Sequence, residues 1–196
     1  MLKRPYQSQE KAIASYNYED IAEGTGVISF YGCKTETSGA TVYKLVQNAI
    51  YSSAPVYAGN SATLTFDLTP FNIPKQIKGT AMFSAGVGGN SGVDNHISVQ
   101  VYHYDGTTAT AISSELLTAS HDFGTLSGYY MVCIPIPLTE TRFNIGDNLR
   151  LVVKLTNDVG SQGEIGVDPK GSESVSTWIP ANKTIMQLDV PFKIDL

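Results

Sequence analysis

The sequence has little charge and no long apolar run. Lys and Arg contribute 13 of the 196 residues and Asp and Glu contribute 18, which gives a formal net charge of −5. Proteins that bind nucleic acid through its phosphates carry a basic face, so we expect no direct nucleic-acid partner. No stretch reaches the ~20 apolar residues of a transmembrane helix, so we expect no membrane contact.

Cysteine is also scarce. Cys33 and Cys133 cannot form a disulfide framework, and because each lies in an apolar run we expect two buried free thiols. Near the N-terminus no apolar segment follows Lys3 and Arg4. We therefore expect no signal peptide, and synthesis in the cytoplasm.

The clearest pattern in the chain is the alternation over residues 184–196. Side chains of one parity are apolar, and those of the other parity are mostly polar or charged. Strict period-2 alternation predicts a half-buried β-strand. A strand this apolar needs partner strands from earlier in the chain. Pro191 has no N–H, which favours an edge strand or a bulge at that point.

The same alternation of strand and turn runs through residues 25–196, with about nine or ten strands and no convincing helix. This predicts an all-β fold, a single β-sandwich of jelly-roll or related Greek-key topology, with a closed barrel as the second choice. Residues 1–24 lack a core pattern of their own. We interpret them as an N-terminal arm that lies on this domain or on a neighbouring subunit, with a disordered terminus as the alternative.

Two segments within this domain allow sharper expectations. Residues 97–117 read as a hairpin in which Asp105 and Gly106 form a two-residue turn. Residues 129–136 (YYMVCIPI) are apolar on both faces. Such a strand is either central and covered on both sides, or has one face at an interface.

No cluster of residues amounts to a catalytic signature. His96 and His103 lie about 20 Å apart on an extended strand and cannot share a metal, and His121 lies in a loop. The motifs of serine hydrolases, zinc proteases, redox proteins and P-loop enzymes are all missing. We therefore predict that the protein is not an enzyme, and we expect no catalytic residue, no cofactor and no metal.

Calcium is the one metal ion for which the loops contain suitable oxygen ligands. Two loops carry oxygen ligands that Ca²⁺ could use, namely Asp94–Asn95 and a second group of Asn157, Asp158, Glu164 and Asp168. Neither loop has the regular spacing of an EF-hand. Turn formation is the simpler explanation of these residues.

The aromatic residues suggest a surface that is made to be covered. Tyrosine and tryptophan are favoured at protein interfaces and on sugar-binding platforms because they join a large apolar area to a polar tip. Plain packing is the alternative for each of them. The candidate interface or ligand surface consists of Tyr102, Tyr104, Tyr129, Tyr130 and Trp178.

The C-terminal part of the chain resembles a known class of proteins. The loop GVDPKGSES (166–174), the final PFKIDL (191–196) and the upstream FNIGDNLRLVVKL (143–155) are similar to segments of small β-sandwich structural proteins from tailed-bacteriophage virions. The resemblance covers about a quarter of the chain. It implies a subunit of the capsid, head fibre or tail, in symmetric oligomers and without catalysis, and it transfers no functional residue.

Three functions follow in order of preference. The first is a virion structural protein that works through contacts with its own copies, as a homo-oligomer, and with other virion proteins. The second is a carbohydrate-binding module or a phage receptor-binding head, for which Tyr102, Tyr104 and Trp178 would form the sugar platform. The third is a β-sandwich enzyme acting on glycans, with His121 and the loop carboxylates as its candidates.

Overall fold

The computed structural model describes most of the chain from Thr25 onward. All regular structure in the described part is β-strand, so it contains no helix that could cross a membrane. The all-β prediction is confirmed. The described residues are 25–37, 40–48, 56–59, 61–89, 96–117, 128–156, 163–169, 179–180 and 183–193. The predicted N-terminal arm, residues 1–24, lies outside them and stays a prediction.

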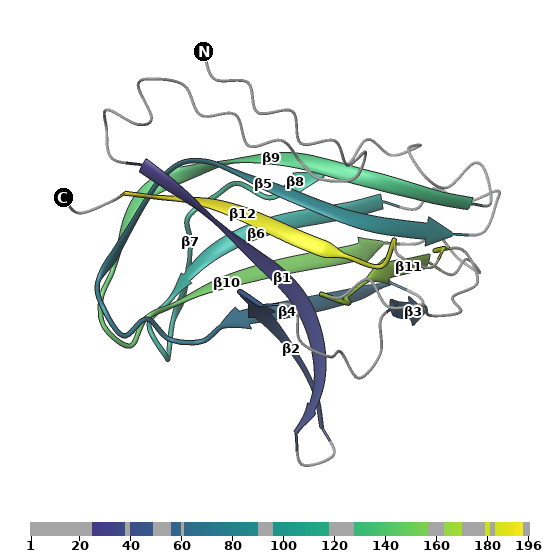
Figure 1. Ribbon diagram of the computed structural model, residues 1–196, viewed down its shortest axis with the longest axis horizontal. Helices are drawn as coiled ribbons and strands as arrows, with labels where there is room; N and C mark the ends of the chain where they lie inside the picture. The colour runs from purple at the N-terminus through teal and green to yellow at the C-terminus, as the bar shows by residue number, and fades with distance from the viewer. Residues whose placement is uncertain are drawn as a thin grey trace.

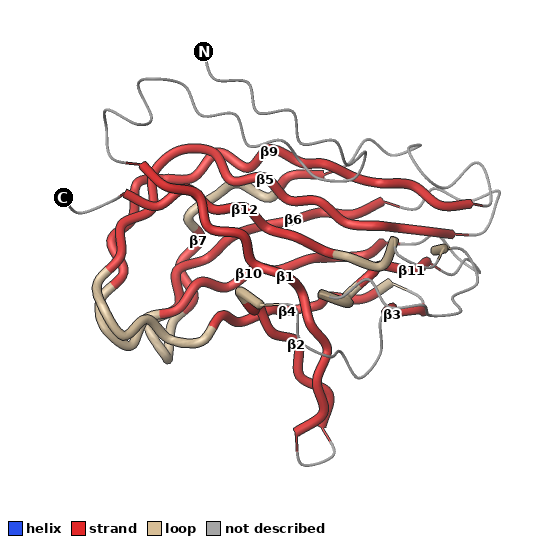
Figure 2. Tube along the Cα trace, viewed as in Figure 1, coloured by secondary structure: helices blue, strands red, loops and turns tan. Residues whose placement is uncertain are grey.

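In the described residues, twelve strands form one continuous hydrogen-bonded sheet. Figure 2 shows that strands make up most of the described trace. Their bounds are β1 Thr25–Thr37, β2 Ala40–Val46, β3 Val56–Gly59, β4 Ala62–Leu68, β5 Lys75–Gly89, β6 His96–Tyr104, β7 Ala109–Ala111, β8 Leu116–Leu117, β9 Gly128–Phe143, β10 Asn148–Thr156, β11 Gly163–Gly166 and β12 Met186–Lys193.

The sheet folds back on itself into two layers, as predicted for a sandwich (Figure 1). One layer has the order β9-β5-β12-β1, with β11 and β3 beyond the end of β12. The other has the order β4-β10-β6, with the short β7 and β8 beside β6. β1 links the layers, because it pairs with β12 up to Tyr31 and with β2 from there on, and β2 runs parallel to β4.

The core lies between the two layers. Alternate residues of each strand point inward, as the period-2 pattern requires. Phe30 and Phe192 meet edge to face in this core, with ring centroids 6.1 Å apart. The fully or nearly fully buried side chains include Phe30, Ala81, Phe83, Ile136, Leu188 and Val190 from one layer and Leu64, Phe66, Val99, Val101, Leu151 and Val153 from the other.

The last strand is central rather than at an edge. β12 lies between β1 and β5 and pairs with both. The register against β5 shifts between Asp189 and Phe192, so the bulge predicted at Pro191 is confirmed and the edge position is wrong. The bulge lets a residue without an N–H sit in the middle of a sheet.

Two further strand predictions need correction. The loop after β6 spans residues 105–108 rather than two residues, and the predicted strand over 107–117 is broken into β7 and β8. The ladder ends after Ala111 because the N–H of Val101 bonds to the hydroxyl of Ser113, and the carbonyl of Ile112 accepts the N–H of Thr139 on β9 instead.

β9 occupies a sheet edge, since in the described residues it pairs along its length only with β5. A central position for residues 129–136 is therefore wrong. Cys33 and Cys133 are both thiols, but only Cys33 is buried. Cys133 is exposed because the outward face of an edge strand has no second layer over it.

Candidate functional site

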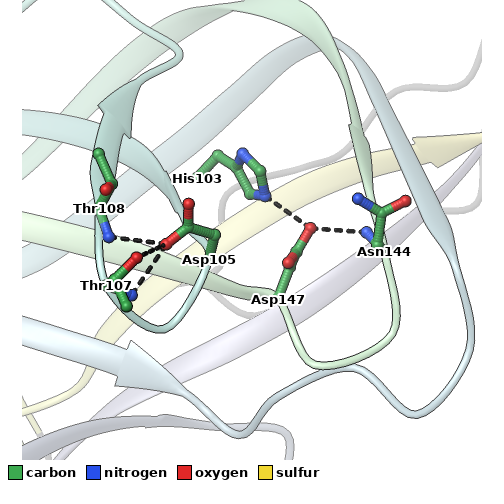
Figure 3. Close-up of polar contacts among 6 residues, drawn as sticks. All are labelled: His103, Asp105, Thr107, Thr108, Asn144 and Asp147. Carbon is green, nitrogen blue, oxygen red and sulfur yellow. Dashed lines mark hydrogen bonds and ion pairs between the residues drawn. The ribbon is translucent and has the colours of Figure 1, made fainter.

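Two turns meet at one end of the sandwich and bring together polar groups from separate parts of the chain (Figure 3). The first is the 105–108 turn after β6. The second is the turn between β9 and β10, where Gly146 has a positive φ of 93° and Asp147 N donates to Asn144 O at 3.2 Å. Glycine tolerates this backbone conformation at low cost.

Asp147 is the centre of this group. Its Oδ2 accepts a hydrogen bond from the backbone N of Asn144 at 2.7 Å and lies 2.7 Å from Nε2 of His103. The N–H of Asn144 and the contact with His103 hold the pKa of Asp147 below its usual value, against an opposing effect of desolvation. The imidazole ring of His103 also meets Phe143 edge to face at 4.7 Å.

Asp105 organises the neighbouring turn. Its Oδ1 accepts bonds from Thr108 N at 2.7 Å and from the N and Oγ1 of Thr107, each at 2.8 Å. These donors, Thr108 N first, lower the pKa of Asp105 to about 2. An aspartate that accepts local backbone bonds in this way closes an Asx turn.

The guanidinium group of Arg150 covers one face of Tyr104, which belongs to the candidate interface or ligand surface. Arg150 binds Asp67 through two hydrogen bonds of 2.6 and 2.9 Å, and its Cζ lies 3.8 Å from the ring centroid of Tyr104. The carboxylate of Asp67 raises the pKa of Arg150 above its already high value. One face of the Tyr104 ring is thus occupied by a guanidinium, which leaves less of it for stacking on a sugar.

The predicted tyrosines do not form one surface. Tyr102 and Tyr104 lie on β6 in one layer, and both are half-buried with their hydroxyls bonded to Gln100 and to the carbonyl of Gly106. Tyr129 and Tyr130 lie on β9 in the other layer, where Tyr130 packs against the core. Trp178 lies outside the described residues, and a ligand role for these residues stays a prediction.

The exposed face of β9 is apolar along most of its length. We call its outward side chains Tyr129, Met131, Cys133, Pro135 and Pro137 the β9 stripe. Tyr129 is half-buried and the other four are exposed, Met131 by 41%. Residues 128–139 contain no charged side chain. The stripe is about 27 Å long, at ~3.3 Å per residue of strand.

The two prolines also change the free edge of β9. Prolines are tolerated in a paired strand where their nitrogens point away from the partner strand. Pro135 and Pro137 are two residues apart, so both nitrogens face the free edge and neither offers a donor there. Missing donors hinder the addition of another strand, so a partner is expected to contact the face of β9 rather than its edge.

The carboxylates predicted for calcium are only partly described. Glu164 and Asp168 are buried, at 2% and 1% exposure, and Glu164 accepts a bond from Ile179 N. Among the described residues, no three His, Cys, Asp or Glu side chains are grouped as a metal site would need. His121 and the loop residues Asp94, Asn95, Asn157 and Asp158 lie outside the description.

Comparison with known proteins finds similarity in structure and none in sequence. No family model matches the chain, and no curated protein matches it by sequence. An α-amino acid ester hydrolase has a TM-score of 0.57 at 11% identity over 84% of this chain and 36% of its own. A CocE/NonD family hydrolase from Staphylococcus aureus has a TM-score of 0.57 at 12% identity, and the match covers 87% of this chain and 37% of the hydrolase. An aminopeptidase from a marine-sediment Thaumarchaeota archaeon has a TM-score of 0.55 at 8% identity, and the match covers 84% of this chain and 37% of the aminopeptidase.

This chain thus spans just over a third of the length of the hydrolases that it matches. At identities of 8–12% the likeness shows the fold alone. A structure of infectious bursal disease virus matches with a TM-score of only 0.31, which carries no argument about a virion role. That role stays a prediction.

The prediction that the protein is not an enzyme is overturned by these matches, because the β-sandwich found here occurs within hydrolases. The prediction rested on missing local motifs. In a sandwich, side chains meet through turns that are far apart in the sequence, as His103 and Asp147 do, so the absence of a short motif excludes little.

Proposed function

We propose that this protein is a structural component of a virion that works through contacts between its own copies, made by the face of β9. The observation that carries the proposal is the exposure of the β9 stripe. The resemblance of segments 143–155, 166–174 and 191–196 to phage structural proteins supports the virion context.

An uncharged apolar strand face is unusual on a protein that remains alone in water. Scattered apolar side chains are normal on surfaces, but a contiguous row of them marks an interaction site. Cys133 lies opposite Ser84 of β5, so the neighbouring strand adds a small side chain beside the middle of the stripe. A second copy could therefore approach closely.

Light scattering coupled to size exclusion tests the proposal. The unmodified protein is expected to elute with a mass that is a multiple of 21.1 kDa. Met131→Glu would place a charge in the contact and is expected to shift the protein towards the monomer. Ile73→Glu is the matched control, because Ile73 is also an exposed apolar residue, at 52%, but lies between β4 and β5.

A monomer at all concentrations, or an oligomer that Met131→Glu leaves intact, would contradict the role of β9. A loss of oligomer in Ile73→Glu to the same extent would show that any surface charge has this effect.

Hydrolysis is a second candidate, favoured by the fold and by the His103–Asp147 pair. An imidazole held by a carboxylate is the arrangement of a general base. Within the described residues no hydroxyl or thiol is hydrogen-bonded to His103, so the ring would act on water rather than on a protein nucleophile. His103 is partly accessible, with 22% of its side chain exposed.

Turnover of amino acid p-nitrophenyl esters tests this second candidate. General-base catalysis typically contributes ~10²–10⁴-fold, so His103→Gln is expected to remove a rate enhancement of that order. His96→Gln is the control, since His96 lies at the other end of β6. Absence of turnover, or the same turnover in His103→Gln, would rule out this role.

A further inference from the structure

The outward face of the layer β9-β5-β12-β1 is unevenly covered. In β12 the core-facing residues are Leu188, Val190 and Phe192, so Asp189 and Pro191 point outward. Both are nevertheless buried, Asp189 to 6% exposure. The β9 stripe on the same face is open. Burial on this face is therefore concentrated over the strand at the middle of the layer.

The neighbouring strands continue the pattern. On β1, Val27 and Ser29 point outward and are half-buried, and on β5 so is Met82. Ser29 donates a hydrogen bond to Asp189, which also accepts one from Gln187. These bonds hold the carboxylate down on the sheet, where it is shielded from water.

No described strand lies over this part of the face. The strands beside β12 are β1 and β5, both within the same layer, and the other layer covers the opposite side. The described segment before β12 reaches the outward face only near Gly86, where a Cβ would lie 2.0 Å from the carbonyl oxygen of Lys183. The described residues that bond to Asp189 are its neighbours in the same sheet, Ser29 and Gln187, which leaves room for a further segment over this face.

We propose that this segment is residues 1–24 of the same chain, lying across the outward face of β1, β12 and β5. Residue 24 directly precedes Thr25, which pairs with Lys193 at one end of this layer. At ~3.3 Å per residue, 24 residues can reach much farther than the ~23 Å length of the eight-residue β12. The segment thus starts at the face and has ample length to cross it.

The charges at the point of entry are complementary. Lys193 and Lys78 are both exposed, and Lys193 is paired directly with Thr25. The segment carries three acidic residues immediately before Thr25, namely Glu19, Asp20 and Glu23. Before and among these acidic residues it carries apolar and aromatic side chains, Ile13, Tyr16, Tyr18 and Ile21 among them, that could pack over Val27 and Met82.

Thiol labelling tests this proposal without reference to oligomers or catalysis. In a Cys33→Ser, Cys133→Ser background, Met82→Cys places a single thiol on the half-buried part of the face. Thr80→Cys is the matched control, two residues away on the same strand and exposed. Maleimide is expected to label the Met82→Cys protein about tenfold more slowly than the Thr80→Cys protein, because labelling then needs local opening.

Deleting residues 1–24 is expected to remove that difference and leave the Thr80→Cys rate unchanged. Because a truncated chain can lose its fold, the decisive variant is the intact chain with Glu19→Lys, Asp20→Lys and Glu23→Lys. Repulsion of the three new lysines by Lys78 and Lys193 should raise the rate at which maleimide labels Met82→Cys. Added salt screens this repulsion, so it should bring that rate closer to the rate of the Met82→Cys protein that keeps Glu19, Asp20 and Glu23.

An unchanged Met82→Cys rate in the folded deletion variant and in the charge-reversed chain would overturn the proposal. So would protection that disappears on dilution together with a fall in mass, since the occupant would then be a second copy.

Discussion

At the scale of single residues, Asp105 and Asp147 each order a turn by accepting backbone hydrogen bonds. Within the described part of the chain, Asp105 bonds to residues of its own turn, Thr107 and Thr108. Asp147 joins its turn, at Asn144, to His103 on another strand. The first arrangement depends on local sequence, whereas the second exists only because the two strands are neighbours.

The pKa of Asp105 gives one prediction. A titration followed by NMR should place its pKa at about 2, and Thr107→Val should raise it because one donor to the carboxylate is removed. Since folding lowers this pKa, the stabilisation by Asp105 is present above pH ~4 and is lost as the pH falls towards 2. Thr110→Val on β7 is the control and should leave the midpoint in place. A midpoint near 3.9 in the unmodified protein would refute the arrangement.

Replacing Asp147 gives a second prediction. Asp147→Ala leaves the N–H of Asn144 and the ring of His103 without their acceptor, and it should cost about 1–3 kcal/mol in urea unfolding. Folding lowers the pKa of Asp147 as well, so the difference from the unmodified protein should be full at neutral pH and shrink below pH ~4. Arg142→Ala, at an exposed position of β9, should stay within about 0.5 kcal/mol.

At the scale of elements, β9 and β12 each occupy the kind of sheet position that the apolar pattern of the other strand predicts. β12 alternates like a strand with one wet face, yet it lies between β1 and β5 with both faces largely buried. β9 is apolar on both faces, yet it lies at an edge with one face open. The proposed contacts account for both, because residues 1–24 would cover β12 and a second copy would cover β9.

Gly86 of β5 gives a prediction at this scale. A Cβ at this position would lie 2.0 Å from the carbonyl oxygen of Lys183, and backbone cannot yield as a flexible side chain would. Gly86→Ala should therefore destabilise the protein by about 1–3 kcal/mol in urea unfolding. Ser84→Ala, on the same strand and face, is the control, and an equal effect of the two substitutions would show that the close approach is unimportant.

At the scale of the whole molecule, the fold closes through its last strand. β12 pairs on one side with β1, at the start of the described chain, and on the other side with β5. Its inward residues Leu188, Val190 and Phe192 fill the centre of one layer. Contacts between distant parts of the chain dominate such a fold, which is expected to form slowly.

Removal of this strand is the prediction for the whole molecule. Deletion of residues 186–196 should abolish the cooperative transition in calorimetry, because β1 and β5 lose their shared partner and the core loses one wall. A synthetic peptide of residues 184–196, added in trans, should restore the transition. A cooperative melt of the shortened chain by itself would show that β12 is dispensable.

The sequence by itself determined the strands, because alternation of apolar and polar residues is a local property. It predicted the all-β sandwich, and it gave a bulge at Pro191 as one of two alternatives. These features need no knowledge of which strands are neighbours.

Only the tertiary structure decided which strand is central and which is at the edge, and hence that Cys133 is exposed. It also decided that Asp147 meets His103 and that Arg150 covers Tyr104. These pairs are separated by more than forty residues, as the 44-residue separation of His103 and Asp147 shows. Their contact depends on β6 pairing with β10, and alternation within one strand carries no information about the identity of its partner.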